Sequence, residues 1–410
     1  MKILLVHNFY GSSAPSGENT VFLAERDMLR KYGHDVIEYT RHSDEIRNRG
    51  SIGMIQGALA TPWNPFSRQK IRQILIKEQP DVMHVHNTFP LLSPAIFHAT
   101  RGLRTATVLT LHNYRTFCAA GIPMRNSVPC TLCLDRHFAL PALKYGCYRN
   151  SKLATLPMAI MIEMHRQIKT WHRDVDAFVA LTGFQANKLT DAGLPRKRMH
   201  TKPHFYPALP ESLPWKERDP GVVFIGRLGP EKGLHVLVEA WKAWGNTAPS
   251  LEFIGEGPER LKLETRVDQS GLRHKIRFHG QMPFSQVQEK LAHARLLVLP
   301  SLCFEGFPMV IREAFALGVP VVASRLGSLP FLVEDGKSGV LFRPGDSADL
   351  YKKIKNLWDN PDELAAMGRN ARADFEEKYT ADVNYDILMD IYRSAMDVRH
   401  QRNNKHREFI

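Results

Sequence analysis

A glycine-rich loop with two basic side chains is the first segment whose composition could bind a ligand. It spans residues 226–233, reads G-R-L-G-P-E-K-G, and lies between a short apolar run and a helical pattern. Glycines allow close backbone approach, a helix start offers unpaired N–H groups, and Arg227 and Lys232 add positive charge. This combination suits a diphosphate, although the loop has neither the Walker A order nor the G-x-G-x-x-G dinucleotide order. A surface turn with two solvated cations is the alternative.

A second segment carries two glutamates with seven residues between them, and reads E-G-F-P-M-V-I-R-E. Glu305 is predicted in a loop after an apolar strand, and Glu313 one turn into the next helix. Backbone N–H groups at that helix start can donate to phosphate oxygens, which would place Glu305 near a reacting sugar and Glu313 near ribose hydroxyls. A capped surface helix with an exposed glutamate is the alternative. The other residues assigned to this binding segment are Gly306, Phe307, Met309 and Val310.

In this order, the two segments resemble the signature of glycosyltransferase family 4, the retaining GT-B transferases that use nucleotide sugars. Segments 253–258 and 278–280 also match the donor domain of that family. The resemblance implies that Arg227 and Lys232 hold the donor diphosphate, and that the loops 255–257 and 280–282 flank the base. It also implies that Glu305 contacts the donor sugar and Glu313 the ribose.

The amino-terminal half resembles the family more loosely. Gly17 matches the second glycine of a pair that family members carry, while Ser16 replaces the first. His112, at the end of a predicted strand, matches the active-site histidine. The resemblance implies that Gly17 approaches the diphosphate, and that His112 and Glu305 are the catalytic residues, acting by positioning the substrate. It implies no cofactor for catalysis, because positive charge on the protein can stabilise the leaving diphosphate.

Three further histidines leave two readings open. His84 and His86 point to one face of a predicted strand, and His7 ends the first strand. Contact with an acceptor and a packing role fit each of them equally well.

Four of the five cysteines crowd into one segment. Cys118, Cys130, Cys133 and Cys147 have the spacing C-x₁₁-C-x₂-C-x₁₃-C. A C-x₂-C pair with two further cysteines has the ligand count of a tetrahedral structural zinc site. Reduced thiols fit the same pattern, and in a reducing compartment disulfides are the weaker explanation.

The positioning elements form two similar halves. Short apolar runs alternate with helical patterns, which predicts an α/β protein with two doubly wound Rossmann-like domains, and the resemblance implies the GT-B arrangement in which they face a central cleft. Residues 1–205 would form the acceptor-side domain, rejoined by the C-terminal helix 381–410, and residues 206–380 the nucleotide-sugar domain. A segment with five prolines, 201–220, is the predicted linker. The run 175–181 is predicted as the last strand of the first half.

Composition excludes several protein classes. The 410 residues are 43% hydrophobic and contain no apolar stretch of the roughly 18 residues that a membrane-spanning helix needs. The opening apolar run is too short for a signal peptide, so a cytoplasmic location is expected. The net charge of +13 favours anionic partners. Segment 151–170 is amphipathic and basic, and could lie on an anionic membrane or form a core helix.

Taken together, the sequence predicts a retaining glycosyltransferase. The resemblance implies a UDP- or GDP-sugar donor, a sugar or lipid-linked saccharide acceptor, and a place in bacterial exopolysaccharide, capsule or lipopolysaccharide synthesis, with the enzyme peripheral on the inner membrane face. An epimerase or a sucrose-synthase-like transferase is the alternative within the fold. A nucleic-acid-binding protein would explain the charge but not the pair Glu305 and Glu313, so no nucleic acid is expected as a partner.

Overall fold

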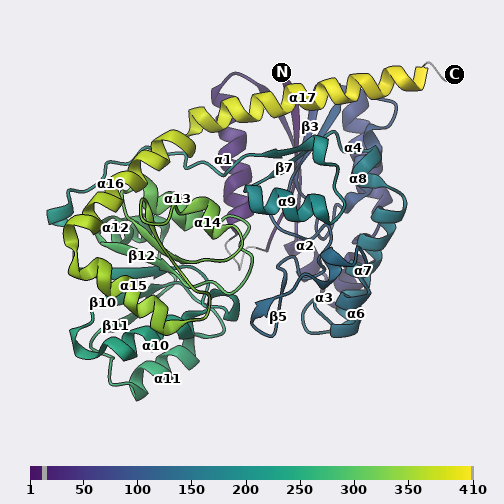
Figure 1. Ribbon diagram of the computed structural model, residues 1–410. Coiled ribbons are helices and arrows are strands. Elements are labelled where there is room, and N and C mark those ends of the chain that lie inside the picture. The colour runs from purple at the N-terminus through teal and green to yellow at the C-terminus, as the bar shows by residue number, and fades with distance from the viewer. Residues whose placement is uncertain (12–15, 408–410) are drawn as a thin grey trace. The chain divides into compact units, whose positions relative to one another are not determined.

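The computed structural model describes residues 1–11 and 16–407, and for residues 405–407 only the backbone (Figure 1). The chain divides into two compact units. Unit 1 contains Met1–Pro123, Thr131–Pro203 and Asn384–Ile410, and unit 2 contains Met124–Cys130 and His204–Val383. The last helix, α17 (Ala381–Arg407), therefore begins in unit 2 and continues through unit 1.

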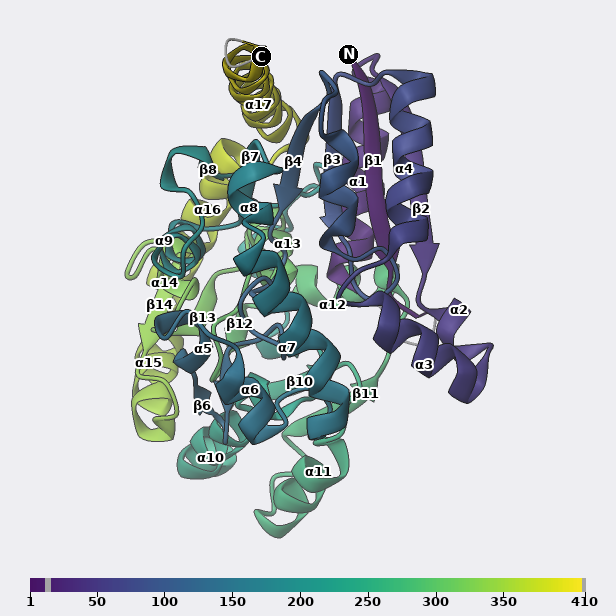
Figure 2. The ribbon, with the colours of Figure 1, turned by 90° about the vertical axis from the view of Figure 1, so that its right-hand side faces the viewer.

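Unit 1 is built on a parallel six-stranded sheet with the order β2-β1-β3-β4-β7-β8. Its strands are β1 (Lys2–Phe9), β2 (Asp35–His42), β3 (Val82–Asn87), β4 (Ala106–Thr110), β7 (Ala177–Ala180) and β8 (Met199–Thr201). Every residue of β3 and β4 is buried, as in a parallel sheet covered on both faces. In β3 the polar residues His84, His86 and Asn87 are buried together with the apolar ones. Figure 2 shows β1, β3 and β4 side by side, with α1 and α4 next to them.

The helices of unit 1 follow the strands. They are α1 (Gly17–Lys31), α2 (Asp44–Arg47), α3 (Gly50–Ala60), α4 (Pro65–Glu78), α5 (Leu132–Asp135), α6 (Leu140–Tyr145), α7 (Lys152–Gln167), α8 (Thr170–Arg173) and α9 (Gly183–Asp191). Buried polar contacts hold α17 on this unit, because Tyr392 lies 2.8 Å from His84 and Arg399 pairs with Asp176 at 2.7 Å.

Unit 2 carries a second parallel sheet, with the order β11-β10-β9-β12-β13-β14. Its strands are β9 (Gly221–Ile225), β10 (Ser250–Ile254), β11 (Ile276–Gly280), β12 (Leu296–Leu299), β13 (Val321–Ser324) and β14 (Gly339–Phe342). Its helices are α10 (Leu234–Trp244), α11 (Arg260–Gln269), α12 (Phe284–His293), α13 (Met309–Ala316), α14 (Leu329–Leu332), α15 (Ser347–Asp359) and α16 (Pro361–Lys378). A short hairpin is grouped with this unit, and each of its strands, β5 (Met124–Arg125) and β6 (Val128–Pro129), has two residues.

The predicted fold class, two doubly wound parallel sheets, is confirmed for each unit. The prediction that 175–181 is the last strand of the first half was wrong, because one more strand, β8, pairs with β7 at the edge of the sheet. Along residues 1–11 and 16–407, no helix combines the length and the apolar composition that crossing a membrane requires.

Candidate functional site

The strand order of unit 2 explains why its two motifs belong together. If its strands are numbered 1 to 6 along the sequence, their order across the sheet is 3-2-1-4-5-6. The direction of winding reverses between β9 and β12. The connections that leave these two strands diverge, and ligands of such sheets bind beyond the carboxyl ends at this switch point. The loop 226–233 follows β9 and the loop 300–308 follows β12. Both motifs therefore lie at the position where the fold predicts a ligand.

Gly233 allows the two loops to approach closely. Its φ of +63° lies in the left-handed region, and a Cβ atom there would lie 2.1 Å from the carbonyl oxygen of Pro300. The backbone N–H of Leu302 donates to the carbonyl of Glu231 at 2.8 Å. A glycine directly after Lys232 is therefore needed to fix the first loop against the second.

Lys232 and Glu305 form an ion pair across this contact. Lys232 Nζ donates to Glu305 Oε1 at 2.7 Å, and the hydroxyl of Ser301 donates to the same oxygen at 2.6 Å. Burial alone would lower the pKa of the Lys232 ammonium, but Glu305 and neighbouring Cys303 hold it above its ordinary value. The site thus retains a positive charge beside a carboxylate, with side chains only 20% and 13% exposed.

Arg227 is the more accessible of the two basic residues. Its guanidinium donates to Glu231 Oε1 at 2.6 Å, while its side chain remains 61% exposed. Because an exposed guanidinium binds a phosphate bidentately with little desolvation, Arg227 can reach a ligand without leaving its loop.

The start of α13 supplies backbone donors. Met309 and Val310 are its first two residues, and N–H groups in a first turn lack partners within the helix. Gly306 and Phe307 precede them. The ring of Phe307 is buried and packs edge-on against His204 at 5.3 Å, which leaves only its backbone for a ligand.

Glu313 lies one turn into α13, as expected. It is partly buried, and Gln288 Nε2 donates to its Oε2 at 3.4 Å. Burial raises the pKa of this carboxyl group, and Arg312 only partly offsets the rise. Because the contact with Gln288 is long, Glu313 retains acceptor capacity for hydroxyl groups.

In unit 1, the predicted residues also lie at the carboxyl ends of strands. His112 follows β4 and lines a pocket of about 60 Å³ with His86 and Asn113. Gly17 is the first residue of α1, and the next residue, Glu18, accepts a hydrogen bond from Asn113 Nδ2 at 2.8 Å. A larger pocket, of about 1140 Å³, lies at the opposite strand ends beside α17. The rule for parallel sheets favours the end that carries His112.

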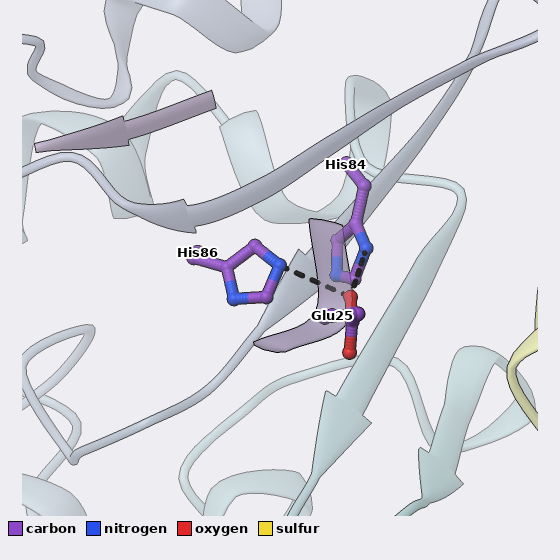
Figure 3. Close-up of side chains that lie close together, drawn as sticks. All are labelled: Glu25, His84 and His86. Carbon is purple, nitrogen blue, oxygen red and sulfur yellow. Dashed lines mark hydrogen bonds and ion pairs between the residues drawn. The ribbon is translucent and has the colours of Figure 1, made fainter. Parts of the chain in front are cut away.

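A buried polar cluster behind His112 was not predicted. Glu25 of α1 lies between His84 and His86, with its Oε1 3.0 Å from His84 Nδ1 and 3.1 Å from His86 Nε2 (Figure 3). Lys202 donates to the other carboxylate oxygen at 2.9 Å. The sequence left the roles of both histidines open and gave no sign of Glu25 or Lys202.

The same cluster has the composition of a metal site. Among the described residues, Glu25, His84 and His86 are the group whose three ligand atoms lie within 4.8 Å of one another. The ammonium group of Lys202 next to Glu25 would repel a cation. His84 also lies within hydrogen-bond distance of Tyr392 at Nδ1 and Thr110 at Nε2, both at 2.8 Å. These contacts favour a hydrogen-bonded network over a metal ion.

The four clustered cysteines take different positions. Cys118 is buried in unit 1, whereas Cys133 and Cys147 are partly buried against the apolar cluster around Met158. Cys130 ends the hairpin segment grouped with unit 2. The structure describes all five cysteines of the chain as thiols, so the zinc site stays a prediction.

Comparison with known families covers most of the chain. Residues 15–206 match the family described as Glycosyltransferase Family 4, and residues 206–374 match the family described as Glycosyl transferases group 1. The boundary between the two matches lies within the predicted linker.

Two curated relatives illustrate the match. Alpha-D-kanosaminyltransferase of Streptomyces kanamyceticus is 30% identical over 176 residues, which cover 42% of this chain and 45% of that protein. The putative colanic acid biosynthesis glycosyltransferase WcaL of Escherichia coli K12 is 28% identical over 226 residues, 52% of this chain and 54% of that protein. The chain spans about half the length of these relatives.

A solved structure matches over nearly the whole length. Alr3699/HepE of Anabaena, in complex with UDP, is similar with a TM-score of 0.66 and 19% identity, over 95% of this chain and 99% of that chain. The same Anabaena protein has also been solved with UDP-glucose. This likeness supports the fold assigned to the two units.

Proposed function

The chain belongs to glycosyltransferase family 4, the GT-B glycosyltransferases, and we propose that it transfers a sugar from a nucleoside-diphosphate sugar to a hydroxyl acceptor with retention of configuration. The observation that carries this proposal is the 2.7 Å pair of Lys232 and Glu305 at the switch point. The ammonium supplies positive charge for a leaving diphosphate, and the adjacent carboxylate can hold a sugar hydroxyl. The UDP and UDP-glucose complexes of the Anabaena relative support this class of donor.

Each binding residue has a role in this proposal. Lys232 and Arg227 bind the diphosphate, together with the backbone at the start of α13, and Glu313 accepts hydrogen bonds from the ribose. The bond between the anomeric carbon and the diphosphate oxygen breaks as the acceptor oxygen bonds to the same face of that carbon. The acceptor proton passes to the departing phosphate. Glu305 positions the sugar in unit 2. In unit 1, His112 is the proposed active-site histidine and Gly17 a proposed backbone contact for the donor.

Ligand stabilisation tests the donor site directly. We expect one nucleotide among UDP, GDP and ADP, or its sugar, to raise the thermal midpoint, because a ligand at 100 times its Kd stabilises by about 2.7 kcal/mol. In the Lys232→Met variant the rise should shrink or vanish, while Lys242→Met, on the exposed face of α10, should retain it. If no nucleotide shifts the wild-type midpoint, the proposed donor site is wrong.

The stereochemistry and the metal requirement are tested on the products. With the donor so identified, NMR of the anomeric proton should show the donor configuration retained. Turnover should survive EDTA, because side chains supply the positive charge in this proposal. An inverted product would contradict retention, and loss of activity restored by added Mg²⁺ would contradict metal independence.

The alternatives within the fold differ in their products. An epimerase would isomerise the donor sugar or release it without an acceptor. A sucrose-synthase-like enzyme would transfer to a small soluble sugar. A nucleic-acid-binding protein would show salt-dependent retention on DNA and would leave the donor sugar intact.

We place the reaction in polysaccharide synthesis on a lipid-linked acceptor. The biosynthetic role named for the WcaL relative supports a polysaccharide product. An exposed apolar surface on unit 1 supports the proposed contact with a membrane. Helix α7 buries one side, whereas Leu153 and Ile160 on the other are 84% and 45% exposed. Helix α3 contacts α7 and exposes four large apolar side chains, at 57–73%: Ile52, Met54, Ile55 and Leu59.

The charges around this surface point to an anionic bilayer as its occupant. The stretches 46–77 and 136–162, which include most of α4 and the first half of α7, contain no Asp or Glu. They carry exposed cations, among them Arg49 and Lys152. Apolar side chains flanked by unopposed cations bind acidic lipid through insertion and electrostatic attraction.

Vesicle sedimentation distinguishes the occupants. We expect the full chain to bind vesicles of phosphatidylglycerol and phosphatidylcholine, to bind pure phosphatidylcholine weakly, and to be released by salt. The Ile55→Ser/Leu59→Ser variant should bind less than wild type, whereas Leu261→Ser, which changes a 77% exposed leucine of unit 2, should not. Concentration-dependent dimerisation lost in the α3 variant, without lipid binding, would assign the surface to a second copy and overturn the proposal.

A further inference from the structure

A continuous chain of hydrogen bonds links Glu25 to His112. Glu25 Oε1 lies 3.1 Å from His86 Nε2, and His86 Nδ1 lies 3.1 Å from His112 Nε2. The rings of His86 and His112 are stacked, with centroids 5.3 Å apart. Glu25 and His86 are both buried, on α1 and β3. The predicted active-site histidine is thus bound through one ring nitrogen to a buried carboxylate relay.

Lys202 fixes the charge at the far end of this chain. Burial alone would raise the pKa of Glu25, but the ammonium of Lys202 and the hydrogen bond from His84 hold it well below its ordinary value. Lys202 Nζ lies 2.9 Å from Glu25 Oε2 and also donates to Asn384 of α17 at 2.8 Å. One carboxylate and one ammonium balance, so neutral rings at His84 and His86 leave the buried cluster without net charge, as burial favours.

The charge of Glu25 determines which atom donates in each of the hydrogen bonds that link Glu25, His86 and His112. An ionised carboxylate only accepts hydrogen bonds, so His86 must donate from Nε2. A neutral imidazole carries one N–H group, and Nδ1 of His86 is then an acceptor. His112 must donate to it from Nε2, which leaves His112 Nδ1 without a proton.

We propose that Glu25 and His86 are positioning residues that hold His112 in the Nε2–H tautomer and so make its Nδ1 the hydrogen-bond acceptor in the active site. The inference rests on the role proposed for His112. It assigns a function to the buried cluster of Figure 3, which otherwise has none.

Glu25→Gln provides a test because it should reverse the chain. The ammonium of Lys202 can only donate, so the amide oxygen of glutamine should turn toward Lys202 and the NH₂ group toward the two imidazoles. His86 would then accept at Nε2 and carry its proton on Nδ1. His112 would have to accept at Nε2, and its own proton would move to Nδ1.

Long-range ¹H–¹⁵N spectra of the full chain with ¹⁵N-labelled histidine report the tautomers without any substrate. His112 is assigned by the signal missing in His112→Gln. We expect the Nε2–H form in wild type, favoured by roughly tenfold or more, and the Nδ1–H form in Glu25→Gln. Tyr392→Phe is the matched control, because it removes a buried hydroxyl bonded to His84 but leaves the Glu25–His86–His112 chain intact.

A second variant covers the case in which Glu25→Gln does not fold. His86→Phe keeps an aromatic ring of similar size and leaves Glu25 paired with Lys202 and His84. It removes the acceptor for His112 Nε2, so the two tautomers should become comparably populated. A wild-type His112 in the Nδ1–H form, or a tautomer unchanged in the variants, overturns the relay.

Turnover separates the relay from the proposed function. With the donor identified by thermal shift, kcat should fall about tenfold or more in Glu25→Gln while KM for the donor stays near wild type. A reversed tautomer with normal kcat would show that the relay exists and that the catalytic role of His112 is wrong. An unchanged tautomer would overturn the relay and leave the donor site as proposed.

Discussion

At the scale of the residue, each basic side chain assigned a role lies against a carboxylate. Lys232 pairs with Glu305, Arg227 with Glu231, and in unit 1 Lys202 with Glu25. The first two pairs are at least partly exposed, and the third is buried. A diphosphate can therefore compete for Lys232 and Arg227, whereas Lys202 is committed to the internal network.

Removing either accessible cation should slow the reaction. In Arg227→Ala and Lys232→Ala we expect kcat/KM to fall about 10²-fold or more, because charge on the leaving diphosphate grows toward the transition state. Steady-state kinetics with the identified donor measure this, and circular dichroism checks the fold. Lys242→Ala should behave as wild type. Near-normal turnover in either site variant would mean that the diphosphate binds elsewhere.

Thiol reactivity and metal content test the cysteine segment together. Burial raises the pKa of Cys118 to about 12, and Cys133 and Cys147 add to the rise. If the four cysteines are thiols, Cys118 should react with iodoacetamide much more slowly than half-buried Cys130, because the thiolate is the nucleophile. Elemental analysis of protein purified without chelator should then give well under one zinc per chain. One zinc per chain with four unreactive cysteines would establish the metal site.

Sequence reasoning reached only part of this chemistry. Lys232, Glu305 and Glu313 could be predicted because their segments combine glycine, charge and a helix start within a few residues. Glu25 and Lys202 are separated by 177 positions and meet only when α1 packs on the sheet. In sequence, a glutamate within a helical pattern is typical of a solvated face, and nothing local marks it as buried.

At the scale of the element, the two loops of the proposed donor site approach each other through Gly233. Gly233 combines a left-handed backbone with a neighbouring carbonyl where a Cβ atom would lie. Gly271, which follows α11, has a φ of +71° and open space around it. The two positions therefore separate the effect of a positive φ from that of steric contact within unit 2.

Alanine at these two positions should have different effects. Gly271→Ala should destabilise by about 1 kcal/mol, the effect of an alanine at positive φ. Gly233→Ala should destabilise clearly more, since the loop must also move away from Pro300, and donor binding should weaken with it. Chemical denaturation and the nucleotide thermal shift measure the two effects. Equal stabilities in the two variants would show that the loops can separate without penalty.

Element boundaries show where a single sequence is uninformative. The sequence predicts strands at 221–225, 251–254, 275–278, 296–299 and 319–323, each within two residues of the bounds of β9 to β13, because each is a short apolar run between turn residues. It predicts no strand at β14. Strand β8 was missed because it has three residues, Met199–Thr201, and a proline-rich segment follows it. Helix α3 was missed because glycines at 50, 53 and 57 lower its propensity, and Gly53 and Gly57 instead pack against Ile46.

At the scale of the whole molecule, acid should destabilise unit 1 through its neutral buried histidines. Burial lowers the pKa of His84 and of His165 to about 4 each. The unfolded chain binds protons below about 6.5 and the folded chain only below about 4, so this stability is present above pH 6.5 and is lost as the pH falls toward 4.

Denaturation at two pH values measures this effect. Between pH 7 and pH 5 we expect the free energy of unfolding to fall by about 1–2 kcal/mol for each such histidine. In His165→Gln, whose amide can still donate to the Pro62 carbonyl, the fall should be smaller by that amount. A pH dependence identical to wild type would mean that folding does not lower the pKa of His165.

The path of α17 has a consequence for how the protein is made. Ribosomes release the chain from the amino terminus, and unit 2, up to Val383, emerges before Asn384, Tyr392 and Arg399 are translated. Those three residues provide buried partners for Lys202, His84 and Asp176. Unit 1 is therefore the first unit to be translated in part and the last to be complete. On the nascent chain, unit 2 can fold before the part of α17 that belongs to unit 1 has been made.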